Sequence, residues 1–365
     1  MSDRYSEFRR LAASLSVDAV ALVPGPNFVR LFNQSFSTSE RPLVVLIPQE
    51  GAPAALVPNL ELGSFALMNF EGEVFDWRDQ DGYMHAFDAL ARHFPLKSLA
   101  VEGQVMRVFV HHALAGANAG LRIVDAEREI SGLRLRKTAS EIAAIEKAIA
   151  ISENALASIL PEIRIGMTEK RIESMLIQAM FSEGTEGLSF TPIVAAGDNS
   201  ALPHASAREH YAVQDGDALL FDFGARADGF IADITRTVFV GHADDEARQV
   251  YETVLKANAV GREITRPGIT AHDVDDAVTS VLEASPFADR IRTKTGHGMG
   301  REVHEAPYIM RGNRQILEAG MVFTDEPGLY EIGRFGVRIE DDILVTEDGC
   351  RSLTSFDREL RVIAG

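Results

Sequence analysis

Apolar and polar residues alternate over residues 1–132 in a pattern that predicts a compact α/β domain. Apolar positions at helical spacing indicate amphipathic helices over residues 8–15 and 83–93. Short apolar runs predict strands at residues 19–23, 43–47, 54–57 and 99–101. Acids and histidines do not cluster along these elements, so we expect this domain to contribute shape or assembly instead of chemistry.

A second domain, residues 133–365, is predicted to begin just after Ser131-Gly132. The basic segment 134–137 leads directly into Thr138, which has capping-box spacing to Glu141 and therefore marks a helix start. Apolar residues then recur at helical spacing until Pro161, at Ile142, Ile145, Ile149, Leu156 and Ile159. This stripe predicts a helix that packs against a core.

A weak internal repeat, with a period of about one hundred residues, runs through the second domain. Residues 164–168 and 266–270 each place a turn glycine and then a threonine, a favoured N-cap, before an amphipathic helix. Further along, an apolar strand follows a turn glycine in each half and reaches an acid, Asp222 in one and Glu326 in the other. The second domain is therefore predicted to consist of two related halves that face each other.

Asp222 lies inside an apolar run, where an isolated carboxylate is costly unless a cation or several donors compensate it. Asp228-Gly229 is a favoured two-residue hairpin turn, and a hairpin folded there places Asp222 opposite Thr235. Asp233 then lies diagonally across on the same face, so the two charges repel unless a cation lies between them. The alternative is an ordinary pair of acids on neighbouring strands.

His297 stands between two glycines, Gly296 and Gly298, which allow the backbone to approach closely around the imidazole. The glycine spacing does not match the dinucleotide-binding fingerprint. Taken alone, this histidine is equally compatible with a metal ligand and with a structural hydrogen bond. Two more acids follow it, Glu326 at a predicted strand end and Glu340 in a mostly extended segment.

Together these residues offer four carboxylates and one imidazole. This oxygen-rich ligand set suits two divalent ions such as manganese, cobalt or zinc. Ions of this kind lower the pKa of a bound water molecule and polarise a carbonyl group. Two further histidines, His204 and His304, are candidates to donate to substrate oxygens or to assist the leaving group. The pattern predicts metal-assisted hydrolysis.

The composition of the chain disfavours several classes of binding partner and several cellular locations. The chain has 36 Lys plus Arg against 54 Asp plus Glu, and its net charge of -18 disfavours nucleic acid and anionic membranes. No signal-like apolar run follows the N-terminus and no long apolar stretch occurs, which disfavours secretion and membrane spanning. Cys350 is the one cysteine, so no internal disulfide can form. We expect a cytoplasmic protein.

Five segments together resemble the M24 metallopeptidases, the superfamily of creatinase, aminopeptidase P, prolidase and methionine aminopeptidase. The segments are residues 202–205, 222–237, 296–305, 326–328 and 338–342. The resemblance implies a pita-bread fold, which is an α+β catalytic domain with an internal pseudo-twofold repeat. It covers residues from about 138 to 350. The preceding domain resembles the creatinase/prolidase N-terminal domain, which methionine aminopeptidases lack.

The resemblance implies two divalent metal ions per chain, with manganese expected and cobalt or zinc as alternatives. Asp222, Asp233 and Glu340 match the ligands of one ion, and Asp233, His297, Glu326 and Glu340 match those of the other. Asp233 and Glu340 therefore correspond to the bridging ligands.

The resemblance also implies roles in catalysis. Glu326 matches the glutamate that handles the proton of the attacking water. His204 and His304 match histidines that contact substrate and stabilise the tetrahedral intermediate, and Arg338 matches an arginine that orients the site. Because no ligand position is missing, the chain differs from the metal-free amidinohydrolases and the non-enzymatic binding members of the superfamily.

The implied activity is hydrolysis of Xaa-Pro bonds in short peptides by a homodimeric proline dipeptidase. One departure from the prolidase pattern bears on the substrate. Many prolidases carry an arginine for the substrate carboxylate where this chain has Tyr308, so either Arg311 or Arg314 reaches that carboxylate from a shifted loop, or the enzyme prefers a substrate longer than a dipeptide. The alternatives are an Xaa-Pro aminopeptidase or carboxyl-end peptidase acting on tripeptides, a metal-free creatinase-like amidinohydrolase, and an inactive binding homologue.

Overall fold

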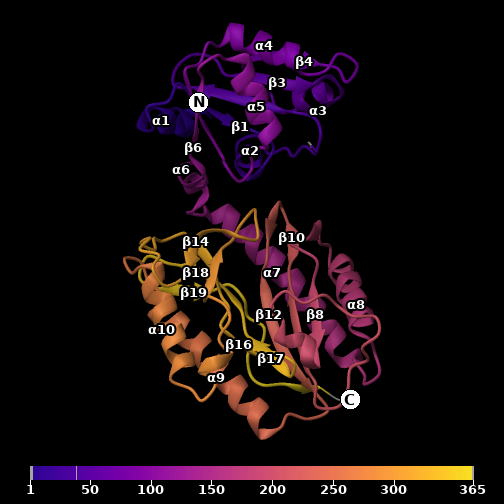
Figure 1. The fold of residues 1–365 in the computed structure, drawn as a ribbon. Coiled ribbons are helices and arrows are strands. Elements are labelled where there is room, and N and C mark those ends of the chain that lie inside the picture. The colour runs from indigo at the N-terminus through magenta and orange to yellow at the C-terminus, as the bar shows by residue number, and fades with distance from the viewer. Residues whose placement is uncertain (1–2, 38, 364–365) are drawn as a thin grey trace. The chain divides into compact units, whose positions relative to one another are not determined.

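The computed structural model describes residues 3–37 and 39–363 and separates into two compact units, shown in Figure 1. The chain up to Arg134 forms one unit, and the chain from Leu135 onward forms the other. The domain boundary expected from the sequence, between residues 132 and 133, lies close to this division.

The N-terminal unit contains a mixed six-stranded sheet with the order β4-β3-β2-β1-β5-β6. Its strands are β1 (Ala19–Leu22), β2 (Val44–Pro48), β3 (Ala54–Pro58), β4 (Glu73–Trp77), β5 (Ser98–Val101) and β6 (Arg122–Asp125). Its α-helices are α1 (Ser6–Ser14), α2 (Pro26–Phe32), α3 (Leu62–Ala66), α4 (Met84–His93), α5 (Val108–Ala117) and α6 (Glu127–Ser131). The strands predicted at β1, β2, β3 and β5 and the helices predicted at α1 and α4 are present.

Alternate residues of the central strands enter two separate apolar clusters, one on each face of this sheet. Val20 and Leu22 of β1 pack into one cluster, whereas Ala19 and Ala21 pack into the other. Because side chains alternate across a strand, a sheet covered on both faces reads as a continuous apolar run. Strand β4 lies at the edge and is largely exposed, so it lacks the apolar run by which the others were recognised.

The C-terminal unit has two halves, each built from two long helices, a larger sheet of mostly antiparallel strands and a second, smaller sheet. The first half contains α7 (Ala139–Ile159), α8 (Glu169–Ser182), β7 (Gly187–Leu188), β8 (Ile193–Ala196), β9 (Ala218–Phe223), β10 (Ala225–Ala227), β11 (Phe230–Ile231) and β12 (Ile234–Val240). The second half contains α9 (Asp245–Ile264), α10 (Ala271–Glu283), β13 (Gly296–Gly298), β14 (Glu305–Ile309), β15 (Val322–Asp325), β16 (Gly328–Glu331), β17 (Phe335–Arg338), β18 (Asp341–Val345) and β19 (Cys350–Ser352). Strand β20 (Val362–Ile363) returns to pair with β12. Figure 1 shows the strands of both halves between the α7/α8 pair and the α9/α10 pair.

The repeat seen in the sequence reappears as equivalent backbone hydrogen bonds. The Gly166 amide donates to the Val213 carbonyl at 2.9 Å, and the Gly268 amide donates to the Leu317 carbonyl at the same distance. Both glycines have φ of +91°, a left-handed conformation that side chains rarely adopt. Thr168 and Thr270 then cap α8 and α10 through their hydroxyl groups. These matches support the predicted pseudo-twofold relation.

The predicted capping box and hairpin are both confirmed. Thr138 and Glu141 cap each other's backbone at the start of α7. Asp228 and Gly229 both have positive φ in a two-residue turn, and β9 pairs with β12 so that Asp222 lies opposite Thr235. The hairpin register therefore fixes which acids share a face.

In the described part of the chain, no helix combines the length and the apolar composition that a membrane crossing requires.

Asp341, the first residue of β18, is a buried carboxylate that holds several segments of the C-terminal unit together. It accepts from Arg236 and Arg262 at 2.9 Å each and from Arg358 at 2.6 Å, and the Thr354 hydroxyl donates to it at 2.7 Å. Burial by itself raises the pKa of Asp341, but Arg236 and Arg358 outweigh it and hold the pKa below its ordinary value.

We expect Asp341→Asn to lower the free energy of unfolding by about 3–5 kcal/mol, because the change leaves buried guanidinium groups without their counter-charge. Urea unfolding at pH 7 measures the loss. The depressed pKa places the stabilisation above about pH 4 and removes it at lower pH, so the two proteins should converge on acidification. Asp357→Asn, in an exposed pair with Arg361, is the control and should cost less than about 1 kcal/mol. Equal losses in both variants would contradict the assignment.

Candidate metal centre and active site

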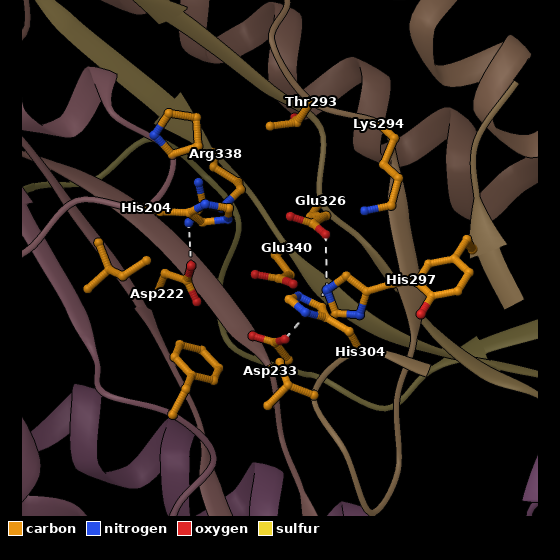
Figure 2. A pocket seen from close by; sticks show the side chains of 15 residues that line it. His204, Asp222, Asp233, Thr293, Lys294, His297, His304, Glu326, Arg338 and Glu340 are labelled. Carbon is orange, nitrogen blue, oxygen red and sulfur yellow. Dashed lines mark hydrogen bonds and ion pairs between the residues drawn. The ribbon is translucent and has the colours of Figure 1, made fainter. Parts of the chain in front are cut away.

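A cavity of about 660 Å³ opens in the C-terminal unit between the two halves. All of the site residues predicted from the sequence line it, namely His204, Asp222, Asp233, His297, His304, Glu326, Arg338 and Glu340. Figure 2 shows the four acids converging on one space, with His297 and His304 on one side and His204 on the other. The rest of the lining includes Phe190, Ile193, Thr293, Lys294 and Tyr308.

Each acid is held at a strand or next to one. Asp222 lies on β9 and Asp233 immediately precedes β12, so the first hairpin supplies both. Glu326 follows β15, and Glu340 lies between β17 and β18, so the second half supplies the other pair. The Glu340 amide donates to the Thr235 carbonyl at 3.1 Å, which ties the two hairpins together at the acids.

Three of these side chains form a compact ligand group. Ligand atoms of Asp233, His297 and Glu340 all lie within 4.8 Å of one another. The Nε2 atom of His297 is 3.3 Å from Oε1 of Glu326 and 3.8 Å from Oδ2 of Asp233. This spacing lets one small cation contact side chains from both halves of the unit.

Two backbone segments pass so close to His297 that only glycine fits on either side of it. A Cβ atom on Gly296 would lie 1.8 Å from the Thr324 carbonyl oxygen, and one on Gly298 would lie 2.1 Å from the Ala306 carbonyl oxygen. The close approach expected from the sequence is therefore present, and it fixes the imidazole between β14 and β15.

The imidazole of His297 is neutral and presents a free nitrogen to the acids. Burial lowers its pKa to about 3, and the neighbouring His304 adds to the effect. Its Nδ1 atom lies 3.2 Å from the Gly298 carbonyl oxygen, which can only accept, so Nδ1 carries the proton. The lone pair of Nε2 then points toward Glu326 and Asp233, as a metal ligand requires.

The four carboxyl groups destabilise one another's charged forms. Burial raises the pKa of Asp233, and the charges of Glu340 and Asp222 raise it further. Burial likewise raises the pKa of Glu340, with Glu326 adding to it. The pKa of Glu326 rises to about 7, mainly through burial, although Arg338 opposes the shift. Burial raises the pKa of Asp222 too, against the pull of Arg338.

This donor set fits divalent cations. Buried acids normally have paired partners, yet Oδ1 of Asp222 has no hydrogen-bond partner among the described residues. Arg338 is the one arginine that lines the cavity, and a single guanidinium cannot neutralise four carboxylates. Carboxylate oxygens with one imidazole nitrogen are the ligands that hard and borderline divalent ions prefer.

Arg338 positions the acids and is itself held on several sides. It donates to Asp222, to the Thr235 hydroxyl at 2.9 Å and to the Tyr330 hydroxyl at 2.9 Å. The Thr235 hydroxyl in turn donates to Glu340. The sequence interpretation used Thr235 only to set the hairpin register and did not single out Tyr330, although Thr235 stands two residues after Asp233 and thus on the same face of the strand.

The two candidate catalytic histidines border the acid cluster. The ring of His304 lies 4.2 Å from that of His297, nearly perpendicular to it. Partial burial lowers the pKa of His304, and the positive charge of Lys294 adds to the effect. His204 lies in the segment that precedes β9 and reaches the cavity from the side of Asp222, as Figure 2 shows.

The region of the expected carboxylate-binding arginine differs from the sequence interpretation. Arg311 pairs with Asp276 at 2.8 Å and with Glu283 at 2.6 Å, and neither Arg311 nor Arg314 lines the cavity. Besides Arg338, which binds the acids, the cation that lines the cavity is Lys294, which the sequence interpretation did not single out. Lys294 and Tyr308 are well separated in the sequence, so the sequence alone did not indicate that both line the same cavity.

Comparisons with known proteins agree with this geometry. A family model described as metallopeptidase family M24 matches residues 143–347, and one described as the creatinase/prolidase N-terminal domain matches residues 4–136. The Xaa-Pro dipeptidase of Pyrococcus horikoshii is 31% identical over 99% of both chains. The probable dipeptidase PepE of Mycobacterium tuberculosis is 34% identical over 98% of this chain and 96% of that protein. The structure of a prolidase from Thermococcus sibiricus matches with a TM-score of 0.92 and 32% identity over the full length of both chains.

Fold and cavity together define a two-domain peptidase whose acids are arranged for divalent metal ions. The chain belongs to metallopeptidase family M24. The predicted architecture, a creatinase/prolidase-type N-terminal domain before a pita-bread catalytic domain, is confirmed.

Cation binding should release protons near neutral pH. Because their pKa values are raised, some of the carboxyl groups carry protons in the cation-free site. These groups must lose their protons before they can bind a cation. We therefore expect stronger cation binding as pH rises from 5 to 8, measured by calorimetry of chelator-stripped protein with Mn²⁺ in buffers of different ionisation enthalpy. By the same linkage, the cation-free protein should lose stability as pH rises from about 4 through these values.

Asp233→Asn tests whether the release comes from this cluster. The variant lacks one of the shared carboxylates, so it should bind more weakly and release fewer protons than the unaltered protein. A binding enthalpy that does not depend on the buffer would show that the acids are already ionised and would contradict the raised pKa values.

Proposed function

We propose that this protein is a metal-dependent Xaa-Pro dipeptidase that hydrolyses the bond before proline in short peptides. The observation that carries the proposal is the convergence of four buried carboxylates and one neutral imidazole in a cavity bordered by two further histidines. The preference for the bond before proline is inferred from the similar proteins, which include Xaa-Pro dipeptidases. In this proposal residues 133–365 form the catalytic domain and residues 1–132 the N-terminal domain.

The proposed centre holds two divalent ions, with manganese preferred and cobalt or zinc as alternatives. Asp222, Asp233 and Glu340 would hold one ion, and Asp233, His297, Glu326 and Glu340 the other. Bound there, divalent ions supply Lewis acidity that polarises the scissile carbonyl and lowers the pKa of a water molecule. The compact group of Asp233, His297 and Glu340 supports the shared position.

The remaining chemistry belongs to the side chains. Glu326, with a pKa of about 7 in the cation-free site, is suited to take a proton from the attacking water and return it to the leaving nitrogen. His204 and His304 donate to the substrate oxygen on which negative charge develops. Arg338 orients Asp222 directly and Glu340 through Thr235.

Lys294 is the proposed binding group for the substrate's terminal carboxylate. It lines the cavity and makes no hydrogen bond or ion pair with another described residue. Figure 2 shows its amino nitrogen directed toward the side of the cluster that carries Glu326. Tyr308 lies in the same lining and replaces the arginine of many prolidases. Lys294 precedes β13, whereas Tyr308 lies on β14. The lysine therefore supplies, from another segment, the positive charge that an arginine at position 308 supplies in many prolidases.

The proposal includes a homodimer, which the family resemblance implies, and a cytoplasmic location, which the single cysteine of the chain favours. Cleavage of tripeptides is the second candidate, favoured by the absence of an arginine at position 308. The complete ligand set speaks against a metal-free amidinohydrolase or an inactive binding protein.

The deciding experiment offers Ala-Pro, Ala-Pro-Ala and Ala-Ala-Pro to chelator-stripped protein restored with Mn²⁺, with products identified by mass spectrometry. We expect metal-dependent cleavage of Ala-Pro. Cleavage confined to tripeptides would replace the dipeptidase by a peptidase that reads a longer chain. His297→Ala is the matched inactive control, because it removes a ligand without adding charge. Failure to cleave any of the three peptides would overturn the proposal.

Lys294→Met should raise KM for Ala-Pro by about 10- to 100-fold, because a charged hydrogen bond to the carboxylate contributes roughly 1.5–3 kcal/mol. Ala-Pro amide, which lacks that carboxylate, should be cleaved equally by both proteins. Steady-state kinetics on the two substrates measure the difference. If the variant loses as much with the amide as with Ala-Pro, Lys294 does not bind the carboxylate.

A further inference from the structure

His204 lies on a segment that has no regular secondary structure. The segment runs from the end of the 3₁₀ helix Gly197–Ala201 to the start of β9. A histidine that must meet a substrate atom needs a fixed position. Since the backbone of this segment forms no strand pairing around His204, other contacts must supply the rigidity.

The carboxylate of Glu169, the first residue of α8, binds the chain on both sides of His204: at the end of β8 and in the 3₁₀ helix before it, and in the His204 segment after it. It is fully buried and accepts from the Ala196 amide at 2.7 Å and from the Asn199 side chain at 3.0 Å. Beyond His204 it accepts from the Arg208 amide at 2.7 Å. The Arg208 guanidinium adds bonds of 3.0 Å and 2.9 Å to the same carboxylate.

Further contacts complete the connection. The Asn199 side chain also donates to the Ser206 carbonyl at 3.0 Å, which closes the chain around His204. The amide of Lys170 in the first turn of α8 donates to the Arg208 carbonyl at 3.2 Å. The Gly336 amide on β17 donates to the Ser200 hydroxyl at 2.9 Å, so the segment also contacts the strand that bears Arg338.

The pseudo-twofold repeat shows that an acid directly after the N-cap threonine is particular to the first half. Thr168 and Thr270 occupy equivalent N-cap positions, and the residue that follows Thr270 is Ala271. Helix α10 therefore begins without an acid at this place. Because only the first half has a carboxylate at this position, we expect its role in a feature that only the first half has. That feature is the segment that carries His204, which Glu169 binds.

We propose that Glu169 is the positioning residue for His204, holding the chain on both sides of it so that the imidazole meets the substrate oxygen. The effect on turnover rests on the proposed function, whereas the effect on the segment does not. Glu169 is outside the cavity and takes no part in the chemistry.

The kinetic test is a double-mutant cycle of Glu169→Gln and His204→Ala. Glutamine keeps the shape but turns an NH₂ group toward backbone donors. We expect Glu169→Gln to lower kcat about 10- to 100-fold, with a smaller change in KM and unchanged manganese binding. In the His204→Ala background the same change should cost less than about threefold, because the group that it positions is already absent. Equal losses in both backgrounds would overturn the proposal.

Glu173→Gln is the matched control. Glu173 is also a buried acid of α8, but it pairs with Lys170 and binds nothing in the His204 segment. We expect near-normal kcat from this variant. A loss as large as that of Glu169→Gln would show a general effect of altering α8.

Hydrogen exchange separates this proposal from the peptidase assignment. Amides of residues 199–208 should exchange at least about tenfold faster in Glu169→Gln and at the unaltered rate in Glu173→Gln. This readout requires no activity, so it decides the role of Glu169 even if no peptide is cleaved. Should Glu169→Gln fail to fold, Arg208→Met provides the same test from the other side of the contact. Unchanged exchange in the folded variant would overturn the proposal.

Discussion

Mutual repulsion among four buried carboxylates is the constraint on which the catalytic unit depends. In a cavity of low dielectric constant, Asp222, Asp233, Glu326 and Glu340 cannot all be ionised without compensating cations. The surrounding structure holds them together nevertheless. The Thr235 carbonyl and hydroxyl groups both bind Glu340 and so join the hairpins at the point of greatest repulsion. Holding these acids together therefore lowers the folding stability of the cation-free protein, and in return the candidate cation site is already formed before a cation binds.

The two halves have a similar backbone fold but contribute different side chains to the site. Each half supplies two acids from a pair of antiparallel strands, so neither half alone can form the centre. His297, the candidate histidine ligand, comes from the second half, while the segment carrying His204 belongs to the first. Figure 2 shows His204 on one side of the acids and His297 and His304 on the other, so the two halves present their histidines from opposite sides of the cavity. The repeat supplies the symmetry of the scaffold, and local side chains supply the asymmetry that chemistry needs.

Features governed by neighbouring residues could be predicted from the sequence. The capping box at Thr138 and the turn at Asp228-Gly229 depend on a few consecutive residues, and the turn sets the register that pairs Asp222 with Thr235. Contacts between distant segments could not be predicted in this way. Lys294 faces the cavity, and Glu169 binds Arg208, only because folding brings distant segments together. The idea that Arg311 takes the place of the missing arginine was wrong, because nearby acids on α10 already bind it.

The close packing around His297 limits how such a site can change over evolutionary time. Carbonyl oxygens occupy the space where side chains at positions 296 and 298 would begin, so neither neighbour can take over as the ligand. Moving the imidazole would require both strands beside it to separate. The centre is therefore resistant to gradual alteration, whereas the side chains of Lys294 and Tyr308 line the open space of the cavity. Descendants of this chain can acquire new substrates through changes at these two positions while inheriting the same metal chemistry.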